Sequence, residues 1–265
     1  MKIPAAQTPA GPRFRFFRSF SALVLREMSS SYGRSPGGYI WAIAEPVAGI
    51  AVMTIVFSYF LRSPPLGTNF MYFFSGGILI FGFYGAIWGK TATTLRAVQA
   101  LIEYPAVSYM DALLARLFLH TMTDLLVMVM VIGGIILIYD LSPILNWAAL
   151  FNAISMAFLF GLGVGLVNCY LFTMYPLWER VWAIINRPLF FLSGVFYLPE
   201  SLPEQGRDIL LWVPTLHMTS EMRRGMFATY DGVYVSSIYV YTLSLGLITF
   251  GLLLLARHHK DMILK

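Results

Sequence analysis

Three long stretches of the sequence carry no charged side chain, and they decide what kind of protein this chain can form. Residues 63–89, 141–178 and 232–256 contain no Asp, Glu, Lys or Arg. Each is longer than the roughly 20 residues that cross a bilayer as a helix. Of all residues, 58% are hydrophobic and 12% are charged, a surplus of apolar surface that a soluble domain cannot bury. The sequence therefore predicts an all-α integral membrane protein.

Apolar runs of spanning length occur six times along the chain. The predicted transmembrane helices cover residues 39–61, 70–88, 112–138, 147–172, 181–198 and 233–256. When the N-terminus is placed on the cytoplasmic side, the only basic residues in the external loops are Arg62, Arg207, Arg223 and Arg224. Basic residues prefer the cytoplasmic side, so both termini are predicted to be cytoplasmic. The net charge of +5 reflects these basic flanks and gives no reason to expect a nucleic-acid partner.

The N-terminal region divides into two parts before the first span. Residues 1–12 are rich in Pro and Ala and are predicted to be disordered. Residues 13–34 predict an amphipathic helix that lies in the headgroup layer. Its two faces carry Phe17, Phe20, Val24 and Met28 on one side and Arg15, Arg18 and Arg26 on the other. A hinge containing Gly33, Pro36, Gly37 and Gly38 follows it. The helix is either a positively charged anchor or a working gate.

Ionisable residues inside the predicted spans are the first candidates for function. Glu45, Asp124 and Arg187 lie within the first, third and fifth spans. Such groups are costly in a bilayer unless they face a partner or water. They form either a structural ion pair between helices or the lining of a polar route.

The stretch between the fifth and sixth spans is long, external and interrupted by prolines. Prolines at 199, 203 and 214 divide it into short pieces, a pattern typical of re-entrant helices buried against protein. His217 and Glu221 are four residues apart within it, but two ligands do not make a metal site. In the fourth span, Gly161 and Gly165 form a GxxxG pattern that predicts close helix packing.

The largest cytoplasmic loop between spans covers residues 91–111. Residues 95–103 have a helical pattern that Tyr104-Pro105 ends. This short helix either lies on the membrane surface or inserts into a soluble partner.

No catalytic constellation is present in the sequence. The four histidines are scattered and no paired carboxylates share a loop, whereas hydrolytic or metal chemistry needs convergent groups. We therefore expect no enzyme activity, cofactor site or metal site in this chain. A membrane-embedded transferase remains the alternative from another functional class.

Several short motifs, in a fixed order, resemble those of a known family. They are Arg26-Glu27, residues 32–46, Leu101-Ile102 with Tyr104-Pro105, residues 193–197, Leu202-Pro203 and residues 214–217. The chain resembles the membrane subunit of ABC-2 type exporters, specifically the permeases of capsular polysaccharide export. The alternative substrates within this family are a lipid, a drug, or another glycan of the O-antigen or teichoic type.

The resemblance implies a multi-pass permease of the bacterial inner membrane, with residues 35–265 as its transmembrane domain. It implies a homodimer joined to two ATPase subunits that hold ATP and Mg²⁺, with periplasmic and outer-membrane export proteins as further partners. Residues 13–34 then lie beside the substrate entrance in contact with membrane lipid, and residues 198–230 close the outer end of the path.

Two sets of site residues follow from this resemblance and from the chemistry of sugars, whose faces stack on aromatic rings. The residues expected to couple the permease to the ATPase are Arg96, Gln99, Leu101, Ile102, Glu103, Tyr104 and Pro105. The residues expected to line the substrate path are Arg26, Arg34, Tyr39, Trp41, Glu45, Trp88, Trp182, Arg187 and Phe190.

Overall fold

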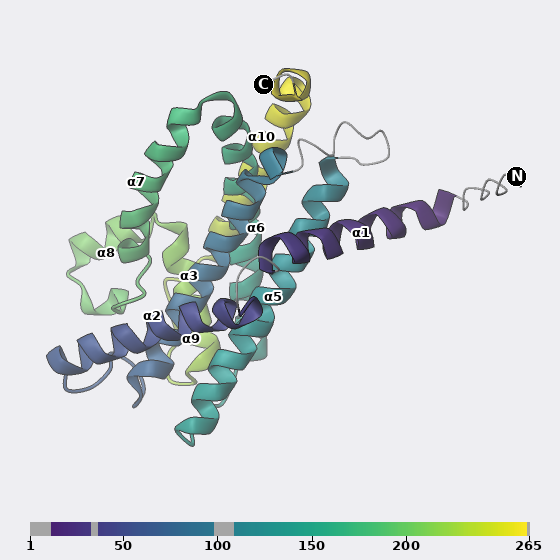
Figure 1. Cartoon of the computed structure of the whole chain (residues 1–265). Helices are drawn as coiled ribbons and strands as arrows, with labels where there is room; N and C mark the ends of the chain where they lie inside the picture. The colour runs from purple at the N-terminus through teal and green to yellow at the C-terminus, as the bar shows by residue number, and fades with distance from the viewer. Residues whose placement is uncertain (1–11, 33–36, 98–108, 264–265) are drawn as a thin grey trace, which may run out of the picture.

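The described part of the chain is helical along most of its length (Figure 1). The computed structural model describes residues 12–32, 37–97 and 109–263. The helices are α1 (Pro12–Tyr32), α2 (Tyr39–Phe60), α3 (Phe70–Ala92), α5 (Tyr109–Ile138), α6 (Trp147–Met174), α7 (Pro176–Leu192), η1 (Pro199–Ser201), α8 (Glu204–Leu210), α9 (Pro214–Met226) and α10 (Ser237–Ile263). The long apolar helices confirm the predicted all-α membrane class.

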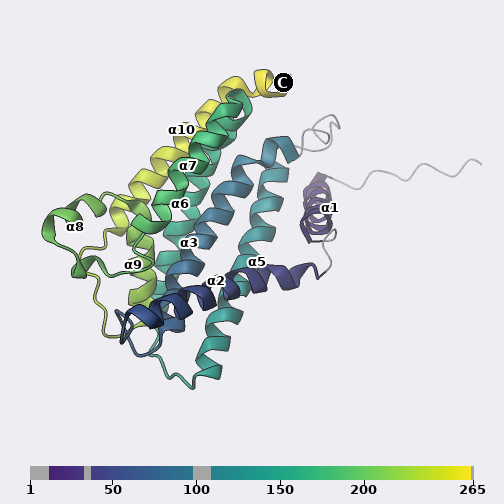
Figure 2. The ribbon, with the colours of Figure 1, turned by 60° about the vertical axis from the view of Figure 1, so that its left-hand side comes forward.

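The centre of the molecule is α6, which lies between α3 and α10 (Figure 2). Glycines on α6 allow this close approach. A Cβ atom at Gly161 would lie 3.0 Å from the carbonyl oxygen of Tyr84 on α3, and one at Gly163 would lie 2.9 Å from Leu247 on α10. Gly165 meets Thr91 of α3 in the same way. The small-residue packing predicted from the GxxxG pattern is therefore confirmed.

Within the described residues, five helices have the length and apolarity to cross a membrane. They cover Tyr39–Phe60, Phe70–Ala92, Met110–Ile138, Trp147–Met174 and Ser237–His258. The second of them is four residues longer than predicted, because α3 continues through Lys90 and Thr91 to Ala92. The last begins at Ser237 and not at residue 233, because a turn at Gly232, with φ of 54°, precedes it.

The predicted span at residues 181–198 differs most from the structure. Its helix, α7, begins earlier, with Pro176 in the first turn, and ends at Leu192 after 17 residues. Gly194 has a φ of 71°, a left-handed conformation that ends the helix. Residues 193–195 are buried beyond it. Because α7 is too short to stand among the five candidate spans, the count of six spans stays a prediction.

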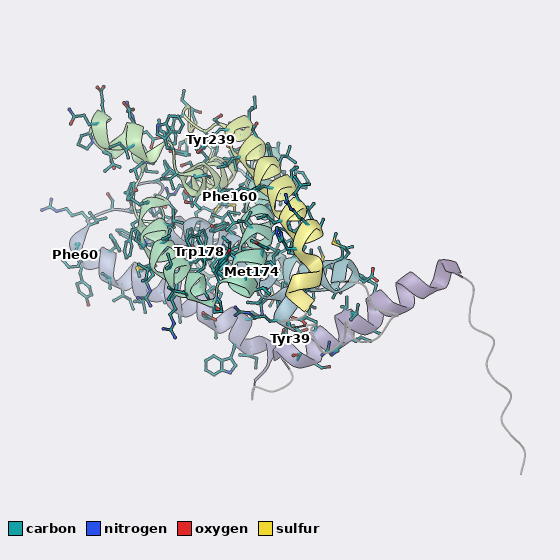
Figure 3. All side chains as sticks on the ribbon, turned by 90° about the horizontal axis from the view of Figure 1, so that it is seen from above. Tyr39, Phe60, Phe160, Met174, Trp178 and Tyr239 are labelled. Carbon is teal, nitrogen blue, oxygen red and sulfur yellow. The ribbon has the colours of Figure 1, made fainter. Side chains whose placement is uncertain are left out.

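The first candidate span, α2, lies across the other long helices and not alongside them (Figures 1 and 2). Its two ends, Tyr39 and Phe60, are far apart in the view from above (Figure 3). It packs on α3 and α5, and Ile50 is its only buried residue. The turn before it places Gly37 and Gly38 at φ of 94° and 41°, which fits the predicted glycine hinge.

The interrupted stretch between α7 and α10 forms the short elements that its prolines predict. Pro199 begins η1, Pro203 precedes α8, and Pro214 begins α9. Helix α9 is buried along almost all of its length, packed against α3 and α6. We call this part of the molecule the α9 end, and the opposite part, where α3 and α6 finish, the coupling end. The placement of these elements in a membrane stays a prediction.

Helix α1 confirms the predicted N-terminal helix and extends away from the bundle (Figure 1). It packs on α5 through Phe20, whose ring meets Phe118 edge-on at 5.7 Å, and through the buried Leu23. Met28, predicted to lie on the same apolar face, is 39% exposed. The predicted disorder of residues 1–12 falls outside the described residues, apart from Pro12.

Candidate substrate path and coupling site

Aromatic rings from α2, α3, α7 and the turn after α7 form two groups of contacting rings, a Trp–Trp pair and a cluster of six Phe, which together we call the aromatic seam. It is composed of Phe57, Phe74, Phe81, Trp88, Trp182, Phe190, Phe191 and Phe196. The ring centroids of Trp88 and Trp182 are 5.7 Å apart, and those of Phe81 and Phe190 are 5.1 Å apart. The structure therefore brings two predicted path residues, Trp88 and Trp182, into contact, and places a third, Phe190, further along the same helix as Trp182.

Helical spacing explains why the three rings on α3 share one face, as do Trp182 and Phe190 on α7. Residues 74, 81 and 88 are aromatic and recur every seven positions on α3, which places them on one face of the helix. Trp182, Asn186 and Phe190 recur every four positions on α7. This spacing is the signal that the sequence analysis did not use, and it would have added Phe74, Phe81 and Asn186 to the predicted path.

Polar groups are buried within the seam. The indole N–H groups of Trp88 and Trp182 and the amide oxygen of Asn186 have no hydrogen-bond partner within the described part of the chain. Most buried polar groups in proteins have one, since burial without a partner costs free energy. A carbohydrate offers hydroxyl groups that both donate and accept, beside faces that stack on aromatic rings.

The other predicted path residues lie away from the seam. Tyr39 and Trp41 are exposed at the start of α2. Arg26 on α1 and Arg187 on α7 are exposed on helices that do not pack together. Arg34 lies outside the described residues. The path that was predicted as one set is therefore divided by the structure into the seam, a group on α1 and α2, and Arg187 on the exposed side of α7.

Glu45 and Asp124 line one cavity of about 490 Å³ between α2, α3 and α5. The cavity is otherwise mostly apolar, with Phe83 and Val127 among its walls. Arg187 does not line it. The structure thus places two of the three predicted ionisable groups together and leaves the third on α7.

At the coupling end, Arg96 is the only member of the predicted coupling set among the described residues; Gln99, Leu101, Ile102, Glu103, Tyr104 and Pro105 lie outside them. An Nη1 atom of Arg96 is 2.6 Å from the carboxylate of Glu179 in the first turn of α7. Arg96 also donates to the carbonyl oxygen of Phe172 on α6. The segment that follows α3 is therefore joined to both α6 and α7.

A charged cluster at the same end was missed by the sequence analysis. The carboxylate of Glu27 on α1 is 3.0 Å from Nε of Arg116 and 3.5 Å from Nε2 of His120, both on α5. The hydrogen bond with His120 and the charges of Arg116 and Lys90 hold the pKa of Glu27 below its ordinary value of 4.5, against the opposing effect of burial. The available signal was the pair Arg116 and His120, four residues apart inside an apolar helix.

At the α9 end, polar side chains fix α9 against its neighbours. Glu221 accepts hydrogen bonds from Asn152 of α6 at 2.7 Å and from Arg224 at 2.9 Å. His217 lies 2.9 Å from the carbonyl oxygen of Leu211 and accepts from the backbone N–H of Ser236. His217 and Glu221 therefore serve separate hydrogen-bond networks that hold the helix in place.

Comparison with known proteins identifies the family. A family model described as ABC-2 type transporter matches residues 18–227. The chain belongs to the ABC-2 type transporter family. The match includes the seam, the charged cluster, α9 and the segment that follows α3, so the residues described above lie within the family's domain. It favours a transporter over a membrane-embedded transferase.

Individual relatives align with nearly the whole ABC-2 chain. The polysialic acid transport protein KpsM of Escherichia coli is 26% identical over 242 residues, which cover 91% of this chain and 94% of that protein. The capsule polysaccharide export inner-membrane protein CtrC of Neisseria meningitidis is 25% identical over 243 residues, covering 92% of each. The capsule polysaccharide export inner-membrane protein BexB of Haemophilus influenzae is 22% identical, again over 92% of each.

Proposed function

We propose that this chain is the permease subunit of an ATP-driven exporter that moves a capsular or other cell-surface polysaccharide across the bacterial inner membrane. Two copies of the chain are joined to two ATPase subunits, and both of its termini face the cytoplasm. Its family membership supports the transporter. The names of relatives that align with more than nine-tenths of its length support the substrate and the membrane.

The aromatic seam is the observation that best supports a sugar as the substrate. It combines aromatic rings, with Trp88 and Trp182 packed edge to face, with their indole N–H groups and the amide oxygen of Asn186, which have no hydrogen-bond partner among the described residues. A lipid tail or an apolar drug offers no hydrogen bonds to these groups, whereas a sugar does. The polymer reaches them when α7 moves away from α3 during the transport cycle, and export proteins of the periplasm and outer membrane receive it.

In this proposal, ATP and Mg²⁺ bind to the partner ATPase and not to this chain. The segment after α3 docks on that partner. Arg96 then joins the docked segment to Glu179 on α7, which is the helix that carries Trp182, Phe190 and Phe191 of the seam. Movement of the ATPase thereby reaches the substrate path through a single ion pair and the bonds of α6.

Two experiments test the proposal. Deleting the gene should abolish surface polysaccharide, and restoring the chain with an ATPase-dead partner should not recover it. In the restored strain, Trp88→Ala and Trp182→Ala should each reduce surface polymer about fivefold or more, because loss of stacking removes roughly 1 kcal/mol or more per ring.

Trp88→Phe and Trp182→Phe separate stacking from hydrogen bonding, since they keep a ring and remove the N–H. They should give smaller losses than the alanine variants. Trp147→Phe is the control, because Trp147 is exposed and lies outside the seam. Normal surface polymer in both alanine variants, with normal amounts of protein, would exclude the seam from the path.

A further inference from the structure

Arg116 on α5 contacts two segments that lie far apart in the sequence. Its Nε atom is 3.0 Å from Oε1 of Glu27 on α1, and its Nη1 donates to the carbonyl oxygen of Thr93 at 3.3 Å. The residue is 7% exposed. One buried guanidinium thus connects the interfacial helix to the point at which α3 ends.

The carbonyl of Thr93 is also the first hydrogen-bond acceptor of the next helical turn. It accepts from the backbone N–H of Ala97 at 3.1 Å. Thr94 and Leu95, which follow it, are buried against the bundle. Arg116 therefore holds the beginning of the turn that leads into the predicted coupling segment.

Glu27 gives α1 its charged attachment to the bundle. Its carboxylate interacts with both Arg116 and His120, and Ser31 donates to it from one turn further along α1. The Glu27 side chain is 15% exposed. Separating a largely buried carboxylate from its cation is unfavourable, because neither charge regains full hydration in place. The carboxylate and the guanidinium are therefore expected to move together.

We propose that Arg116 is a positioning residue that transmits movement of the segment after α3 to the interfacial helix α1. The ATPase displaces this segment, Arg116 follows the carbonyl of Thr93, and Glu27 carries α1 with it. Arginine suits the role because its planar fork bonds two acceptors in different directions, whereas lysine presents a compact single charge. The inference rests on the proposed function, since it assigns the route by which the ATPase acts.

The test compares ATP hydrolysis and polymer export in the complete transporter, reconstituted with its ATPase subunit in lipid vesicles. The variants are Arg116→Lys, Arg116→Gln, Glu27→Gln and the double variant Glu27→Gln/Arg116→Gln. Each should assemble with the ATPase and hydrolyse ATP, while polymer exported per ATP falls about tenfold, as expected for loss of a coupling contact. The double variant should lose no more than the single glutamine variants, because one contact is removed in all three.

Arg180→Lys is the control, because Arg180 is an exposed arginine at the coupling end and should leave the ratio unchanged. An unchanged ratio in the Arg116 variants would overturn the inference. So would additive losses in the double variant, or export and hydrolysis falling in parallel, because those results describe a residue that only supports the fold. If none of these variants assembled with the ATPase, the inference would also be overturned, because the residues would then only support the fold.

A second readout follows α1 directly. The buried Cys169 is the single cysteine of the sequence, so a Cys169→Ala background permits a single reporter at the exposed Ser29 of α1 as Ser29→Cys. Its rate of labelling by a water-soluble maleimide should change with nucleotide in otherwise unaltered transporter and not in Arg116→Lys. A nucleotide response that survives this substitution would reject the route. A transporter that binds no ATPase and exports no polymer even without substitution would instead reject the proposed function, and the route with it.

Discussion

Two buried arginines, one at each end of the bundle, are held by different kinds of acceptor. At the α9 end, Arg223 donates to the backbone carbonyls of Val195 at 2.8 Å and Tyr197 at 2.9 Å, and it lies over the ring of Phe73 at 4.3 Å. At the coupling end, Arg116 donates to the backbone carbonyl of Thr93 and forms an ion pair with the carboxylate of Glu27, on a separate helix. Both are nearly inaccessible to solvent.

The difference shows that a buried arginine can fix one helix in place at one end of the bundle and can join two separate segments at the other. The carbonyl partners of Arg223 belong to the buried turn after α7, so the arginine fixes α9 against that turn. Burial lowers the pKa of Arg223 to about 10, and the side chain therefore stays charged at neutral pH. Arg116 instead joins α1, which projects from the bundle, to the segment after α3. The first arrangement favours rigidity, and the second lets two segments move as a pair.

The largest expected effect comes from breaking the α9 end. Arg223→Met removes the only charge that satisfies two buried carbonyls, so we expect a loss of about 3 kcal/mol in the free energy of unfolding. Unfolding of the purified protein in mixed detergent micelles, with increasing sodium dodecyl sulfate, measures this loss. Arg224→Met is the comparison, because Arg224 is partly exposed and should cost less. Equal stability of Arg223→Met and the unaltered protein would show that Arg223 does not fix α9 against the turn after α7.

The next largest effect concerns the packing of α3 against α6, the two helices that run from the α9 end to the coupling end. In Gly165→Ala, the new Cβ atom would lie 2.5 Å from Thr91 and 2.9 Å from the carbonyl oxygen of Trp88. Helices α3 and α6 must then separate, at a cost of about 2 kcal/mol. Gly133→Ala is the matched control, since nothing lies within 4 Å of its Cβ position. That variant should be neutral or slightly more stable, because alanine favours the helix. The same detergent titration distinguishes them, and equal stability of the two would refute the packing argument.

The attachment of α1 to the bundle should depend on pH, unlike the packing of α9 that Arg223 holds in place. Glu27 makes this attachment, and a hydrogen bond with His120 and the charges of Arg116 and Lys90 hold the pKa of Glu27 below its ordinary value of 4.5. The stabilisation is therefore complete above about pH 5.5 and is lost as the pH falls through 4.5 towards the folded-state pKa. We expect about 1.5 kcal/mol of attachment energy for this charge-assisted contact.

Electron spin resonance of a label at Ser29→Cys, in the Cys169→Ala background, reports this attachment as motion of α1. Motion should increase in acid in that background. In Glu27→Gln it should be high at every pH, because the amide cannot ionise. An acid transition that persists in Glu27→Gln would assign the titration to another group.

The sequence predicted those features that depend on local pattern. Apolar length predicted the five candidate spans, the prolines at 199, 203 and 214 predicted the division of the outer stretch, and the GxxxG spacing predicted close packing of α6 without naming its partner. Each of these is a property of one segment and its own chemistry. Local pattern also placed aromatic residues in the path, and three of them lie in the seam.

The sequence could not predict features that depend on which helices become neighbours. The partnership of Glu27 with Arg116 joins residues 89 positions apart, and nothing in either segment specifies the other. The predicted bounds of the fifth span were wrong, because the left-handed turn at Gly194 ends α7 at Leu192 although the apolar run continues to Leu198. The crosswise direction of α2 follows from its glycine turn and its packing on α3 and α5, which apolarity does not encode.

The smallest expected effect concerns Arg96 and Glu179, whose close contact suggests more stability than it should provide. The two atoms are 2.6 Å apart, but the side chains are 41% and 48% exposed. Water screens an exposed pair, and ordering two long side chains costs entropy, so Arg96→Gln and Glu179→Gln should each change the free energy of unfolding by less than about 1 kcal/mol. The effect should shrink further as salt is raised. Detergent titration at low and high salt measures both quantities, with Arg180→Gln as the control. A loss comparable to that of Arg223→Met would show that the coupling end is as rigid as the α9 end, and the contrast between the two arginines would no longer hold.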